Sequence, residues 1–262
     1  MAAIAAGCGG GDGDDAGPGD DPTAAPTTAA VATTAPAPTG PATELTLRIA
    51  DVRLLNSEES DNAMRVLLPP GVASASVTLT GLPSPNRVIS VCQAQELDRR
   101  MNAPACRQPA DGEAVTVTLG SAASGVEILQ LGVAGPGPEG SSAFLSEVVV
   151  RYSASSRAVN ARLAQIASGD TGTRPTFSLS PPGADGAFRA TVNWSAIPVF
   201  GGTSTGAAIE VVRDGSTLQS QSGGAGLSIS GTVPPPVGNA AIRVQNDGSA
   251  ALVGPRLELL LP

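Results

Sequence analysis

The sequence lacks histidine and lysine altogether, and all fifteen basic residues are arginine. Histidine is the commonest general base of enzymes, and lysine supplies the amine of Schiff-base chemistry. Only 2% of the residues are aromatic: one Trp, one Tyr and four Phe. No run of apolar residues approaches the roughly 18 that a transmembrane helix requires. These absences argue against most classes of enzyme and against a membrane-spanning helix.

The net charge of −8 is concentrated at the N-terminus. Residues 1–43 hold five Asp and no Glu or Arg, which leaves 18 acidic and 15 basic residues in 44–262, a net charge of −3. A segment this close to neutral has no basic patch for nucleic-acid phosphates or anionic lipid headgroups. We therefore expect no nucleic-acid partner.

Residues 1–43 consist mainly of Ala, Gly, Pro, Thr and Asp. They contain too few large apolar side chains to offset the entropy lost on ordering. We predict a disordered tether, and a flexible chain of this length has an end-to-end distance on the order of 30 Å.

From Glu44 onward, apolar and polar residues alternate in short runs such as ELTLRIADVRLL, SASVTLT, SEVVVRYS, AFRATVNWS and AAIEVVR. This period of two, broken by Gly- and Pro-rich clusters, is typical of β-strands in sandwiches. We predict an all-β protein with two tandem β-sandwich modules, jelly-roll or immunoglobulin-like. Module 1 covers 44–166, a hinge covers 167–175, and module 2 covers 176–262. Only DNAMRVLL and ARLAQIAS are compatible with a helical turn.

Two of the three cysteines, Cys92 and Cys106, flank the irregular segment QAQELDRRMNAPA. In an exported protein, two cysteines at this spacing within one module usually form a disulfide. Closing a loop of about 15 residues contributes on the order of 3 kcal/mol in the chain-entropy model. The alternative is a pair of reduced thiols in a cytosolic protein.

The third cysteine, Cys8, lies in the sequence AAGC and is followed by the Gly/Asp and Thr/Pro tether. AAGC resembles the lipobox of bacterial lipoproteins, in which the cysteine is acylated and becomes the N-terminus after cleavage. The seven residues before Cys8 lack the basic and apolar regions of a signal peptide, so the resemblance implies that this peptide begins upstream of Met1. Two acyl chains suffice for stable membrane anchoring. The alternative is an unstructured extension with an incidental cysteine.

Module 2 contains ATVNWS, AAIEVVRDGSTLQSQS and GNAAIRVQNDGSAAL in that order. This pattern of strands and turns resembles the bacterial pre-peptidase C-terminal type of β-sandwich. The resemblance implies an accessory or adhesion module of an exported protein, and it carries no binding residues over to this chain.

The segment GTSTG places Ser204 where the G-x-S-x-G nucleophile elbow has its serine. That motif requires a strand-to-helix turn and a histidine partner. The chain has no histidine, and the flanking runs have the period of strands, so we interpret GTSTG as a loop between strands.

The densest acidic cluster of the folded part contains Glu58, Glu59 and Asp61 in SEESDN. Two carboxylates suffice for glycoside hydrolysis, and a set of oxygen ligands can hold Ca²⁺. The cluster lacks the spacing and the glycine of an EF-hand, so a solvated loop is the simpler interpretation and these residues are only weak metal candidates. We expect no catalytic residue, no cofactor and no metal.

Together these observations predict a non-catalytic lipoprotein of the bacterial cell envelope, anchored in the membrane and exposed outside the cytoplasm. Its β-sandwich modules would serve surface binding, adhesion or assembly with a protein or glycan partner. The alternative is an extracytoplasmic solute- or carbohydrate-binding protein, with a Ca²⁺-assisted loop near Glu58–Asp61.

Overall fold

The computed structural model describes residues 41–55, 64–82, 88–93, 106–119, 127–134, 142–166, 174–195, 206–224, 226–248 and 251–262. The described part of the chain is all-β and contains no helix, so no helix there could cross a membrane. The described residues of the two stretches compatible with a helical turn form none: those of DNAMRVLL form strand β2, and those of ARLAQIAS lie in strands β9 and β10 and in the two residues between them. β2 and β9 bury alternate side chains, the period of strands.

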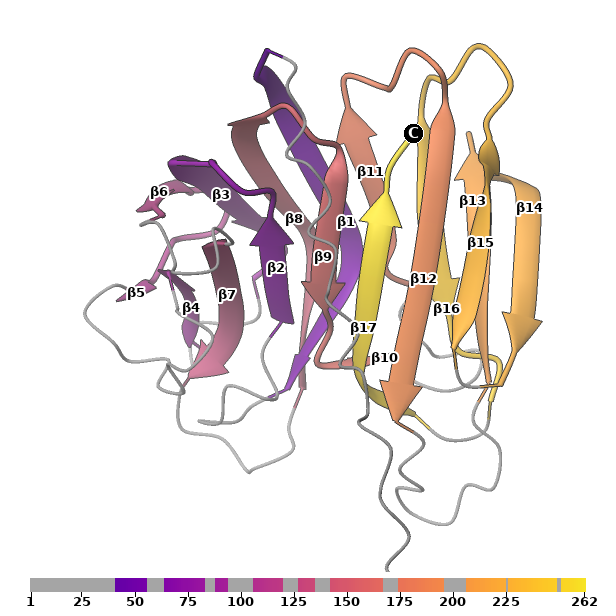
Figure 1. Cartoon of the computed structure of the whole chain (residues 1–262). Coiled ribbons are helices and arrows are strands. Elements are labelled where there is room, and N and C mark those ends of the chain that lie inside the picture. Colours follow the sequence, from indigo (N-terminus) through magenta and orange to yellow (C-terminus); the bar gives the residue numbers. More distant parts are fainter. Residues whose placement is uncertain are drawn as a thin grey trace, which may run out of the picture. The chain divides into compact units, whose positions relative to one another are not determined.

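The strands form two antiparallel sheets, which Figure 1 shows as two layers. The first, sheet A, has eight strands in the order β14 (Ser216–Gly223), β13 (Ala207–Arg213), β16 (Ala240–Gln245), β11 (Thr176–Ser180), β1 (Thr43–Leu55), β8 (Ser142–Ala154), β3 (Ser74–Thr80) and β6 (Ala114–Thr118). The second, sheet B, has nine strands: β15 (Leu227–Thr232), β12 (Ala187–Ser195), β17 (Leu252–Leu260), β9 (Ala158–Arg162), β2 (Met64–Leu68), β7 (Glu127–Ala134), β4 (Val88–Gln93) and β5 (Cys106–Arg107), with β10 (Gln165–Ile166) beside β17.

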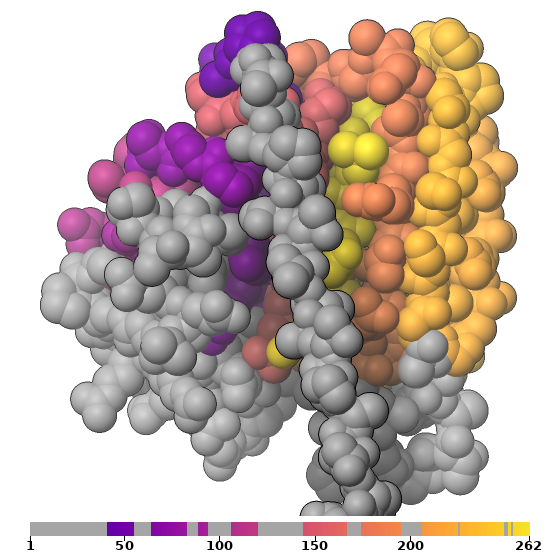
Figure 2. Space-filling view, in the orientation of Figure 1, coloured from indigo at the N-terminus to yellow at the C-terminus, as the bar shows by residue number. Residues whose placement is uncertain are grey.

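Both sheets run through both predicted modules, residues 44–166 and 176–262, which are called the first and second halves of the sequence below. In sheet A, β1 pairs with β11 from Thr46↔Ser180 to Ala50↔Thr176. In sheet B, β17 pairs with β9 from Arg256↔Arg162 to Leu260↔Ala158. Figure 2 shows this second junction on the surface, where β17 lies between β12 and β9. Residues 37–262 form one compact unit. The division into two modules stays a prediction, and the proposed hinge is described only from Arg174 onward.

The core between the sheets consists of apolar side chains that, along strands such as β3 and β12, alternate with polar, more exposed ones. In β3, Ala75, Val77 and Leu79 are buried, whereas the serines and threonines between them are partly or fully exposed. In β12, the alternate residues Phe188, Ala190, Val192 and Trp194 are buried in the same way. One continuous apolar cluster contains residues from both sheets and from both halves of the sequence.

The pattern of burial changes phase within β1 at Asp51. Before Asp51 the odd-numbered side chains from Leu45 to Ile49 are buried, and after it Val52 and Leu54 are buried. Asp51 has a φ of 56°, an uncommon conformation for a residue other than glycine. The pairing with β8 keeps a constant register across this point, with Ala50 opposite Glu147 and Val52 opposite Leu145. The two strands therefore change face together, a feature that alternation along one strand does not predict.

Candidate functional site

Most of the residues singled out in the sequence lie outside the described residues: Cys8, Glu58, Glu59, Asp61 and Ser204. The strands that flank the acidic cluster and Ser204 are described, and all four are strands of the two sheets. In the described part of the chain, no three His, Cys, Asp or Glu side chains gather closely enough to hold a metal ion.

The predicted cysteine pair is brought together. The Sγ atoms of Cys92 and Cys106 lie 1.96 Å apart, at disulfide distance, and Cys92 is 2% exposed. Cys92 is also the register partner of Cys106 in the pairing of β4 with β5. The disulfide therefore fastens the two-residue strand β5 to the edge of sheet B.

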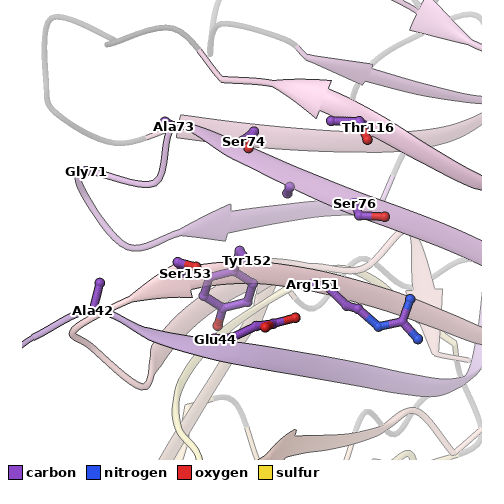
Figure 3. Close-up of a pocket in the computed structure, with 11 residues that line it drawn as sticks. Ala42, Glu44, Gly71, Ala73, Ser74, Ser76, Thr116, Arg151, Tyr152 and Ser153 are labelled. Atoms are coloured by element: carbon purple, nitrogen blue, oxygen red, sulfur yellow. The ribbon is translucent and has the colours of Figure 1, made fainter.

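The candidate binding site is a hollow of about 500 Å³ beside the start of β1. Figure 3 shows residues from β1, β8, β3 and β6 around it, together with the turn between β2 and β3. Its lining consists of small and polar residues: Ala42, Glu44, Gly71, Ala73, Ser74, Ala75, Ser76, Thr116, Arg151, Tyr152 and Ser153. The hollow is open to solvent, and its lining includes the hydroxyl-bearing residues Ser74, Ser76, Thr116 and Ser153.

Register explains how residues so distant in the sequence meet in this hollow. Glu44 lies opposite Ser153, and Arg151 lies opposite Ser76, which in turn lies opposite Thr116. Opposite residues of an antiparallel pair point to the same face of the sheet. One row of polar side chains thus crosses β6, β3 and β8, and Glu44 flanks it on β1.

Glu44 and Arg151 carry opposite charges on neighbouring strands, as Figure 3 shows, but they form no ion pair with each other. Neither side chain makes a hydrogen bond in the described part of the chain. By contrast, Arg48 on the same strand as Glu44 is paired with Glu147 at 2.9 Å. The hollow therefore offers a carboxylate and a guanidinium without partners among the described residues, together with several hydroxyls, and these groups can hydrogen-bond a polyhydroxylated or zwitterionic ligand.

Next to the hollow, the hydroxyl group of Tyr152 is buried and has no hydrogen-bond partner within the described residues. Burial raises the pKa of Tyr152 far above its ordinary value, and the nearby charge of Arg157 opposes this increase. Burial also lowers the pKa of the Arg157 guanidinium, while the neighbouring Tyr152 and Asp185 raise it in part. The phenol therefore stays protonated and cannot serve as a base near neutral pH.

Arg157, in the turn between β8 and β9, binds backbone oxygens from two other segments. Its guanidinium donates to the carbonyls of Pro181 at 2.7 Å, Pro262 at 2.8 Å and Leu261 at 3.2 Å. A longer contact of 3.5 Å reaches Leu179. A charged donor satisfies these carbonyls where the strands end, so Arg157 has a structural role.

No protein-family model, curated protein sequence or solved structure matches the chain.

The sequence analysis missed Glu44, Arg151 and Arg157. Glu44 and Arg151 each lie on a polar position of an alternating strand, where solvated charges are ordinary. Only the register of β1 against β8 places them at one hollow, and no local sequence signal encodes that register. No local sequence signal indicates the role of Arg157 either, because its carbonyl partners lie 22 to 105 residues away.

Proposed function

We propose that the chain is a non-catalytic lipoprotein of the bacterial cell envelope. Acylated Cys8 anchors it, residues 9–43 form the tether, and two fused β-sandwich modules present a surface for binding, adhesion or assembly. Its partner is a protein or a glycan outside the cytoplasm.

The observation that carries this proposal is the continuity of both sheets through the two halves of the sequence. The pairs β1–β11 and β9–β17 join the halves along whole strands, which favours a rigid, extended surface over two freely jointed modules. A rigid surface loses little conformational entropy when it binds a partner, which benefits a protein whose task is presentation.

The position of the first strand supports the same proposal. β1 begins at Thr43, the last residue of the predicted tether, and lies in the middle of sheet A with β11 on one side and β8 on the other. A pull on the tether would thus be carried by two ladders of backbone hydrogen bonds.

The test is to express the gene with its upstream reading frame in a bacterial host and to follow the protein through membrane fractionation and detergent phase separation. We expect the parent protein in the membrane and detergent fractions, and the Cys8→Ser variant in the aqueous fraction. Cys106→Ser is the matched control and should not change the partitioning. Equal partitioning of parent and Cys8→Ser would exclude a lipid anchor at this residue.

A second candidate function, binding of a solute or carbohydrate, is favoured by the unpaired Glu44 and Arg151 at the hollow. Carboxylates and guanidinium groups hydrogen-bond sugar hydroxyls as acceptors and donors, respectively. A glycan array followed by calorimetry on any hit tests this role. Binding at the hollow should be lost in Arg151→Met and kept in Arg189→Met, a control on the outer face of β12.

The Ca²⁺-assisted form of this candidate rests on Glu58, Glu59 and Asp61. A calorimetric titration with Ca²⁺ that gave no heat, and no increase in melting temperature, would exclude it.

A further inference from the structure

Among the described residues, strand β14 is the outermost strand of sheet A and pairs with β13 alone. Figure 1 shows it at the margin of the fold, with no strand beyond it. All eight residues, Ser216–Gly223, are exposed. The outer edge of β14 therefore offers unpaired backbone N–H and C=O groups to any strand that can align with it.

This edge has little of the usual protection against such pairing, since its one bulge lies near the start of the strand, at Leu218. Proteins commonly protect edge strands with charges, proline or very short length. β14 has eight residues with neither charge nor proline, and no charged residue occurs between Gly215 and Ile242. This interval also contains β15, the outermost strand of sheet B. Both sheets thus end, on this side, in uncharged strands.

The edge strands at the opposite margin of the two sheets, β5 and β6, are shorter than β14 and contain or follow a charged residue. β5 has two residues, one of them Arg107, and the other is fastened to β4 through the cysteine pair. β6 has five residues and follows Glu113. Short length and neighbouring charge limit pairing at that margin, whereas β14 is longer than either strand and uncharged.

We propose that β14 pairs antiparallel with β14 of a second copy of this chain, so that sheet A continues from one copy into the next around a two-fold axis. A symmetric pair of this kind sets identical surfaces against each other, so a charge on the axis would face its own sign and a charge near the axis would lie close to its equivalent. β14 carries no charge, so this repulsion is absent and the strand is compatible with its own copy as the occupant.

The sequence of β14 also suits the two-fold axis. A register bulge leaves Leu218 without a partner on β13, and regular pairing extends from Gln219 to Gly223. With the axis at Ser220, Gln219 faces Gln221 of the second copy and Ser220 faces its own equivalent. Each amide then meets an amide that can donate and accept. Leu218, 39% exposed, faces Ser222 of the second copy and is covered.

The experiment uses the full chain with Cys8→Ser, which removes intermolecular disulfides and any lipid and so separates this proposal from the envelope anchor. Sedimentation equilibrium across a dilution series should give twice the chain mass. Ser220→Arg and Ser220→Glu should each give a single-chain mass, since both place like charges at the axis. An equimolar mixture of these two variants should recover the doubled mass.

Asn160→Arg, on the central strand β9, is the matched control and should keep the doubled mass. A parent chain that stays at single mass would overturn the proposal, as would a Ser220→Arg variant that still dimerises. Loss of the dimer in both Ser220 variants without recovery in the mixture would show that a different segment of the second copy occupies the edge.

Discussion

The Nη2 atom of Arg157 lies 2.8 Å from the carbonyl oxygen of Pro262, and this hydrogen bond joins the turn after β8 to the residues that follow β17. The same guanidinium also reaches Leu261, Pro181 and, more distantly, Leu179. Arg157 belongs to predicted module 1 (44–166), and all four carbonyls belong to predicted module 2 (176–262). One side chain thus reinforces the two junctions at which the sheets cross between the halves.

Arg157→Ala should lower the free energy of unfolding by on the order of 2–3 kcal/mol, because it leaves several carbonyls without a charged donor. Urea denaturation measures the change. Arg48→Ala is the control, since Arg48 makes an exposed ion pair with Glu147 that contributes at most about 1 kcal/mol. Equal effects of the two substitutions would contradict the structural role of Arg157.

Replacing both Cys92 and Cys106 with Ala should lower the free energy of unfolding by about 3 kcal/mol, the entropy of closing a loop of about 15 residues. Urea midpoints under non-reducing conditions measure the loss. Dithiothreitol should also lower the urea midpoint of the parent protein, and it should leave the urea midpoint of the double variant unchanged. An equal response of both proteins to the reductant would rule out a disulfide between these residues.

Tyr152 should titrate only well above its ordinary pKa while the protein is folded, because its buried hydroxyl resists ionisation. It is the only tyrosine in the chain, so absorbance near 295 nm follows its ionisation alone. In urea the phenol should ionise near pH 10, and in the folded protein only when the protein unfolds.

The sign of the pH effect follows from proton binding. Above about pH 10 the unfolded state has released a proton that the native state still holds, so the free energy of unfolding falls as the pH rises. Tyr152→Phe should reduce this alkaline loss. At neutral pH it should raise the free energy of unfolding, because it removes a buried hydroxyl that has no hydrogen-bond partner in the described structure and so carries an uncompensated desolvation cost. An ordinary pKa in the folded protein would show that the phenol reaches solvent.

The single tryptophan and the single tyrosine lie in different halves of the sequence, and both are buried. If the continuous sheets make the two halves one cooperative unit, Trp194 fluorescence and Tyr152 absorbance should report the same urea midpoint. Arg157→Ala should shift both midpoints together. Two separate midpoints would show that the halves unfold as independent modules.

The sequence predicted the strands but not their partners. The run SASVTLT predicted β3 as the structure has it, Ser74–Thr80, because serine and threonine alternate with buried apolar residues. β14, with the sequence STLQSQSG, was missed because an edge strand exposed along its whole length shows no alternation. The stretch that contains β2 was compatible with a helical turn as well, because five residues, MRVLL, are too few to distinguish the two periods.

The predicted disulfide follows from cysteine spacing, a local signal, and the structure brings Cys92 and Cys106 to bonding distance. The hollow at Glu44 and Arg151 was not predicted, since it depends on the pairing of strands about a hundred residues apart. The pairing of β1 with β11 and of β9 with β17 depends in the same way on the whole chain. Local patterns specify which face of a strand is buried, and the competition among all strands decides which edges meet.

The proposed anchor at Cys8 is the central claim, and the intact mass of the protein extracted from its native membranes tests it most directly. We expect a chain that begins at Cys8 and carries added acyl groups, and we expect both features to be lost in Cys8→Ser. A chain that retains the residues before Cys8 and carries no lipid would contradict the account.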